Sequence, residues 1–202
     1  TAGMPLFDPP VILEADLSPL LLDCALWGVG DPAALRWLDP PPKAALEEAR
    51  GRLAELGALD DSARPTEHGK AIARLPLPPR LAHMLVAAGE RGFGELAAEV
   101  AVLLSERGLG GNDVDLERRL ERWRGERGAR AEAGRGLVRR WAKLLPHTHL
   151  SSLKGGELSM ALALAYPDRI ARRRDSSGEH WLSVSGRGYR LDAAHHLAKE
   201  EW

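Results

Sequence analysis

The stretch Leu53–Leu85, LAELGALDDSARPTEHGKAIARLPLPPRLAHML, holds a helix end, a tight turn, a capped helix and a proline-rich bend. Gly57 stands where a left-handed residue would end the first helix. Thr66 precedes the next helix as its N-cap, because a hydroxyl oxygen can accept from a free backbone N–H. Pro76–Pro79 then form a stiff link before helix resumes. These signals predict the local folds on both sides of the link.

The residues before the link predict three helices and a small hairpin. Ser18-Pro19 and Asp31-Pro32 each read as a cap followed by proline at the first helical position. Apolar residues at helical spacing extend the third helix to Leu56, and Asp60-Asp61-Ser62 is suited to a hairpin turn. A helix over residues 67–74 follows. Three helices with such a β-wing form the plan of a winged helix, which we place at residues 18–75, after an extended arm over residues 1–17.

The residues after the link predict a helical bundle and then a different kind of fold. Helical spacing covers residues 80–88, 96–104, 113–127 and 131–145, so residues 76–145 form the bundle. Beyond Pro146 we expect a helix over 157–165 and strands over 169–173, 181–185 and 189–191. The expected fold class is mainly α, with a small α+β subdomain over residues 146–202. That subdomain is expected to be incomplete, because Trp202 falls in a helical-looking run.

The composition excludes several classes of protein. The chain has 202 residues, 44% hydrophobic, yet no apolar run long enough to cross a membrane. Residues 1–10 lack the basic and apolar regions of a signal peptide, and the start at Thr1 predicts a piece of a longer protein. Cys24 is the one cysteine and lies in an apolar helical run, so we expect it in the core. No internal disulfide can form, which fits a cytoplasmic protein.

The motifs of common enzymes are missing. There is no GxxxxGK[ST] phosphate loop and no GxSxG, and the surroundings of Cys24 do not suit a nucleophile. His147, His149 and the pair His195-His196 have no carboxylate or thiol nearby at metal-ligand spacing, so a polar connection is the preferred interpretation. The sequence therefore predicts no catalytic residue, no metal and no cofactor for this chain by itself.

The charges are distributed unevenly. The net charge is -1, but residues 113–145 carry 10 Lys/Arg against 6 Asp/Glu, whereas residues 1–112 carry 10 against 16. Arginine dominates, and its planar fork suits phosphate oxygens. A GC-rich genome that favours arginine codons explains the same bias equally well.

Three basic clusters are candidates for nucleic-acid contact. Near the proline bend the candidates sit on or beside helix N-terminal turns, where N–H groups attract anions. The second cluster has no acidic neighbours, and the third stands at a strand end. The candidates are Arg74, Arg80, His83, Arg139, Arg140, Lys143, Arg172 and Arg173. The arginines between residues 118 and 127 alternate with glutamates, and their i,i+4 spacing favours a salt-bridged, solvated face instead.

Several runs resemble the region that follows the second motor lobe in DEAH/RHA-type ATP-dependent RNA helicases. They are Asp39-Pro40-Pro41, Leu56-Gly57-Ala58-Leu59-Asp60, Thr66-Glu67-His68-Gly69-Lys70, Leu75-Pro76-Leu77 and Pro79-Arg80-Leu81-Ala82-His83-Met84-Leu85. His68-Gly69, Arg36–Pro41 and Ala163–Ala171 resemble the bacterial HrpB branch of that family. Val11 and Lys70 depart from the usual Glu and Arg.

The resemblance implies a winged helix passing into a helicase-associated, or ratchet, domain, followed by part of an HrpB-type C-terminal domain. It implies that these parts form one wall of a channel for single-stranded RNA or DNA, and couple it to the motor lobes. ATP and Mg²⁺ would belong to the motor lobes of the parent helicase. Those lobes lie before Thr1 in such a protein, so this chain is expected to be inactive alone.

Two other functions stay open. A winged helix can serve as a protein-interaction module without nucleic acid, and the acidic charge of residues 1–112 favours this slightly. A regulator of duplex DNA is a weaker alternative, because the helix that would read the groove, residues 42–56, is not strongly basic. It carries Glu47, Glu48 and Glu55 against Lys43, Arg50 and Arg52.

Overall fold

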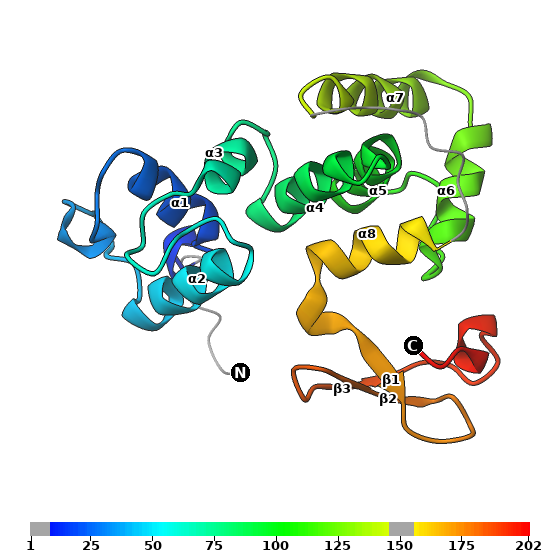
Figure 1. Ribbon diagram of the computed structural model, residues 1–202. Helices are drawn as coiled ribbons and strands as arrows, with labels where there is room; N and C mark the ends of the chain where they lie inside the picture. Colours follow the sequence, from blue (N-terminus) through cyan, green and yellow to red (C-terminus); the bar gives the residue numbers. More distant parts are fainter. Residues whose placement is uncertain (1–8, 146–155) are drawn as a thin grey trace, which may run out of the picture. The chain divides into compact units, whose positions relative to one another are not determined.

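The computed structural model describes residues 9–145 and 156–202, and these form two compact units (Figure 1). The first unit is Thr1–Ala82 and the second is His83–Trp202. The boundary falls within helix α4 (Pro79–Glu90). The predicted fold class is confirmed in its main feature, because the described residues are mainly helical with one small sheet.

Before α4, the described residues of the first unit form three α-helices and two short 3₁₀ turns. The α-helices are α1 (Ser18–Leu26), α2 (Lys43–Glu55) and α3 (Glu67–Ala73). The 3₁₀ turns are η1 (Val11–Leu13), which lies in the predicted extended arm, and η2 (Pro32–Ala34). α1 packs against both α2 and α3. Leu53 and Ile72 are almost completely buried between them, as is Cys24, so the prediction of a core cysteine is confirmed.

The helix starts differ in detail from the predictions. Ser18 does not cap α1; instead Oδ1 of Asp16 accepts from the backbone N–H and the hydroxyl of Ser18, at 2.9 and 2.6 Å. Asp31 does cap its helix, accepting from the N–H of Ala33. The helix that begins after Asp31 is only a short 3₁₀ turn, because Leu35 has extended backbone angles.

The connection between α2 and α3 confirms the predicted hairpin and both of its end signals. Leu59 and Pro65 form a β-bridge, and Gly57 has φ +67° directly after α2. The hydroxyl of Thr66 accepts from the N–H of Gly69 and donates to the carbonyl of Gly57. A Cβ on Gly69 would lie 2.1 Å from the carbonyl oxygen of Ala58, so α3 packs directly on the hairpin backbone.

Besides α4, the described residues of the second unit form four α-helices. They are α5 (Gly94–Ser105), α6 (Leu116–Gly125), α7 (Ala129–Ala142) and α8 (Glu157–Ala165), and α5 is central because it packs against the other three (Figure 1). Eight residues of α5 are buried, because apolar side chains cover most of its circumference. Gly134 of α7 lies so close to the buried ring of Trp123 that a Cβ there would be 2.8 Å from Cζ2.

The small sheet lies at the C-terminal end of the second unit. Its strands are β1 (Ala171–Arg173), β2 (His180–Ser183) and β3 (Gly188–Arg190), antiparallel in the order β1-β2-β3. The predicted strand over 169–173 is shorter, because Pro167–Arg169 form a 3₁₀ turn, η3. A final 3₁₀ turn, η4 (His196–Lys199), follows the sheet. Within the described ranges, no helix is long and apolar enough to cross a membrane.

Candidate nucleic-acid interface

The basic residues at the end of α7 form the most accessible of the candidate clusters. Arg139, Arg140 and Lys143 are all exposed, while Val138 and Trp141 bury the opposite side of the helix. Among the residues that the structure describes, no carboxylate lies within ion-pair distance of these three cations. We define them as the α7 basic cluster.

The position of the α7 basic cluster also has a structural explanation. Arg139 and Arg140 occupy the last turn of α7, and Lys143 is its C-cap residue. Cations at a helix C-terminus interact favourably with the helix dipole, typically by about 0.3–1 kcal/mol each when exposed. The helix dipole alone does not require three cations at this end. The N–H donors of Arg139, Arg140 and Lys143 also stay available to phosphate oxygens.

The cluster beside the proline bend is divided between two helix ends. Arg74 is the C-cap of α3, so it is next to carbonyl groups and not to free N–H groups. Arg80 is the second residue of α4, in its N-terminal turn, and His83 lies one turn later. Of these three residues, only Arg80 therefore lies in a helix N-terminal turn, where backbone N–H groups attract anions. Burial acts to raise the pKa of Asp16, but the hydrogen bonds from Ser18 and then the charges of Arg52 and Arg80 outweigh it and lower that pKa.

The candidates on β1 are already engaged within the chain. Arg172 pairs with Glu201 at 3.0 Å, and its guanidinium lies 5.2 Å from the ring centroid of Trp202. Arg173 donates to the carbonyls of Ala198 and Lys199, both at 3.2 Å. These contacts hold residues 198–202 beside β1, so a phosphate would have to compete for both side chains.

The arginines of α6 are salt-bridged, as predicted, but with other partners. Arg118 pairs with Asp115 and Arg122 with Asp113, so both reach the segment before the helix. Arg124 pairs with Glu99 of α5, and Arg119 donates to the carbonyls of Leu103 and Leu109. The predicted i,i+4 pairs are replaced by contacts that join α6 to its neighbours. This surface is therefore electrically balanced.

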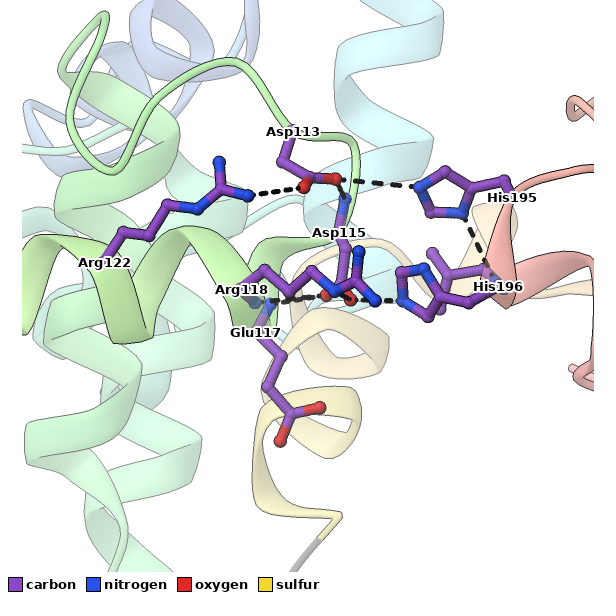
Figure 2. Close-up of polar contacts among 8 residues, drawn as sticks. Asp113, Asp115, Glu117, Arg118, Arg122, His195 and His196 are labelled. Carbon is purple, nitrogen blue, oxygen red and sulfur yellow. Dashed lines mark hydrogen bonds and ion pairs between the residues drawn. The ribbon is translucent and has the colours of Figure 1, made fainter.

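A cluster of two histidines and two aspartates joins η4 to the start of α6 (Figure 2). Nε2 of His196 lies 2.6 Å from Oδ2 of Asp115, and Nε2 of His195 lies 3.6 Å from Oδ1 of Asp113. The two imidazole rings are 4.4 Å apart. Asp115 also accepts from the N–H groups of Glu117 and Arg118, so it is the N-cap of α6, and the helix predicted over residues 113–127 starts later, at Leu116.

Local hydrogen bonds set the ionisation of both aspartates. Burial acts to raise the pKa of Asp115, but the hydrogen bonds from His196, Arg118 and Glu117 outweigh it and lower that pKa. The pKa of Asp113 is lowered chiefly by the hydrogen bond from the N–H of Asp115, and further by the neighbouring His195. Both side chains are thus stabilised as carboxylates.

Sequence reasoning missed this cluster, because its two halves are 81 residues apart. No carboxylate stands close to His195-His196 in the sequence, but in the folded chain Asp113 and Asp115 lie beside them, so the prediction of an isolated histidine pair is wrong. The described residues nevertheless include no group of three or more side chains arranged to hold a metal ion. His147 and His149 lie outside the described residues.

The sequence is similar to those of known ATP-dependent RNA helicases. No family model matches the chain. The ATP-dependent RNA helicase HrpB of Escherichia coli is 36% identical over 201 residues, which cover 96% of this chain and 22% of that protein. The probable ATP-dependent RNA helicase DHR2 of Saccharomyces cerevisiae is 32% identical over 106 residues, covering 52% of this chain and 14% of that protein.

Solved structures give the same result. A crystal structure of the E. coli DExH-box NTPase HrpB superimposes with a TM-score of 0.79 at 34% identity, covering 97% of this chain and 23% of that chain. A crystal structure of the Escherichia coli DEAH/RHA helicase HrpB gives a TM-score of 0.77 at 35% identity, covering 96% of this chain and 24% of that one. The chain thus spans less than a quarter of these relatives. The matches extend over nearly the whole chain and agree with its being a C-terminal region of an HrpB-like helicase.

Proposed function

We propose that this chain is the accessory C-terminal region of a DEAH/RHA-type RNA helicase, and that it forms one wall of the channel for a single strand. In this proposal residues 18–75 are the winged helix, 76–145 the ratchet domain and 146–202 part of the HrpB-type C-terminal domain. The parent helicase supplies ATP and Mg²⁺ chemistry through motor lobes that this chain contacts. A cytoplasmic location is part of the same proposal.

The observation that carries the proposal is the α7 basic cluster. Its three cations are exposed and lack ion-pair partners among the described residues, in a chain related over nearly its whole length to HrpB. Side chains of this kind bind the phosphates of any sequence, as a translocating strand requires. We therefore expect the main strand contact at Arg139, Arg140 and Lys143, with Arg80 adding to it. Arg74, His83, Arg172 and Arg173 remain weaker candidates.

The first test measures binding of fluorescein-labelled single-stranded RNA to the chain at several salt concentrations. Neutralising n phosphates lowers log K with log[salt] by about 0.7n for a single strand. Replacing Arg139, Arg140 and Lys143 together by glutamine should make that slope shallower by about 2. Arg50→Gln, an exposed cation on α2, is the control and should leave the slope unchanged. Binding that does not depend on salt would refute phosphate contact.

A second function, protein interaction without nucleic acid, is favoured by exposed apolar side chains in the first unit. Trp27 is 85% exposed and Leu38 is 98% exposed, so a partner protein that covered them would bury apolar surface. Co-purification of the chain with isolated motor lobes, with and without RNA, separates the two functions. Binding to the lobes that RNA does not strengthen, together with no RNA binding by the chain, would favour the interaction module.

A further inference from the structure

Gly136 lies in the middle of α7 on the side of the helix that faces away from the core. The buried residues Ala131, Gly134, Val138 and Trp141 share one face of α7. With 3.6 residues per turn, position 136 falls opposite the centre of that face. Arg139 and Arg140 follow it by one turn and Lys143 by two turns, so the α7 basic cluster continues the same exposed stripe.

The space over Gly136 is open. A Cβ at this position would have no heavy atom within 4 Å, and the backbone angles are those of an ordinary helical residue. Glycine in a helix interior destabilises it relative to alanine, so a reason for keeping it is expected. Gly134 has such a reason in the ring of Trp123, but nothing in the described residues requires glycine at 136.

Resting on the function proposed above, we propose that Gly136 is a positioning residue that lets the sugar-phosphate backbone of a single strand lie directly against α7. Without a Cβ, the strand can approach the helix backbone closely. Its phosphates then reach Arg139, Arg140 and Lys143 together, because these side chains extend from the adjoining turns. The bases point away from the helix, so contact does not depend on sequence.

The charges near Gly136 fit this arrangement. Glu132, one turn before it, is held by Arg135, with Nη2 of Arg135 at 2.7 Å from Oε1 of Glu132. The charges of this ion pair cancel, so the net positive charge of this helix face lies in its C-terminal half. The exposed groups beyond it are the cations of the α7 basic cluster. A polyanion therefore complements this half of α7 better than a basic or an apolar surface does.

The test compares Gly136→Ala and Gly136→Gln with the unchanged chain, using single-stranded RNA of about 12 nucleotides in a fluorescence-anisotropy titration. We expect the affinity to fall about 3-fold for alanine and about 10-fold for glutamine, because added bulk lifts the strand from its phosphate contacts. The melting temperature should rise by about 2–4 °C for alanine, since the helix gains a better helix former. Weaker binding by a more stable protein cannot be explained by damage to the fold.

Gly51→Ala is the matched control. Like Gly136, Gly51 is interior to a helix and has no atoms near an added Cβ, but it lies on α2. This variant should gain stability and keep its affinity. If the Gly136 variants bind like the unchanged chain while the triple glutamine variant of the α7 basic cluster binds weakly, the positioning role is wrong and the proposed function stands. If the unchanged chain shows no salt-dependent binding, the proposed function fails, and this inference fails with it.

Discussion

At the scale of single residues, a few close contacts carry much of the specificity of the fold. Gly69, Gly134 and Asp115 are the clearest cases, because each has surroundings that only one or two residue types satisfy. Gly69 and Gly134 face a backbone carbonyl and an indole ring, respectively, and Asp115 accepts two backbone N–H groups and contacts a histidine. Substitutions at these positions should therefore have large effects.

Gly69→Ala should destabilise the first unit by about 2–3 kcal/mol, because the new methyl group would collide with the carbonyl of Ala58. Urea denaturation followed by circular dichroism measures the change. Gly51→Ala is the control and should stabilise by about 0.5–1 kcal/mol. Equal effects of the two substitutions would show that α3 does not rest on the hairpin as described.

Asp115→Ala should cost about 1–2 kcal/mol of stability in the second unit, because α6 loses its N-cap. Glu117→Gln is the control, since its side chain points away from the cluster (Figure 2) and should change stability by less than about 0.5 kcal/mol. Denaturant melts of both variants give the comparison. A loss of similar size in the control would contradict the capping role.

At the scale of elements, the contact between η4 and the start of α6 should depend on pH on the acid side. The pKa of Asp115 and the pKa of Asp113 are lowered in the folded chain. A carboxylate with a depressed pKa stabilises the fold above its unfolded value of about 3.9, and that contribution is lost as the pH falls through the folded value. The folded chain is therefore more stable at neutral pH than in acid.

We expect the stability difference between the unchanged chain and Asp115→Asn to be largest between pH 5 and 8 and to shrink below about pH 4. Thermal melts in a series of buffers measure it. Glu157→Gln, on α8, serves as the control, because it does not belong to the histidine–aspartate cluster. A difference that stays constant from pH 3 to pH 8 would show that the ionisation of Asp115 does not stabilise this contact.

At the scale of the whole molecule, the link before α4 is the place where the proposed domains would be coupled. Pro78 accepts from the N–H groups of Leu81 and Ala82, and Pro79 begins α4. Replacing both prolines by glycine should loosen the link and reduce the RNA unwound per ATP hydrolysed in the full-length helicase. A strand-displacement assay run beside an ATPase assay gives this ratio. If the RNA unwound per ATP hydrolysed does not change, the link does not couple the proposed domains.

Local signals in the sequence determined most of the helix positions. Gly57, Thr66 and Pro79 act through their own backbone conformation or their own hydrogen bonds, so their effects can be read without knowing the rest of the chain. The helix over 157–165 was predicted to the residue for the same reason. Where a signal has two nearby candidates, as with Asp113 and Asp115 or Asp16 and Ser18, the sequence did not separate them.

Only the tertiary structure decided which charged groups meet. His196 contacts Asp115 across 81 residues, Arg124 pairs with Glu99 on another helix, and Arg173 is engaged by the C-terminal carbonyls. These pairings leave Arg139, Arg140 and Lys143 exposed and without carboxylate partners among the described residues. The physical reason is the range of the interactions: caps and turns act over a few neighbouring residues, whereas ion pairs form between any side chains that packing brings within a few ångströms.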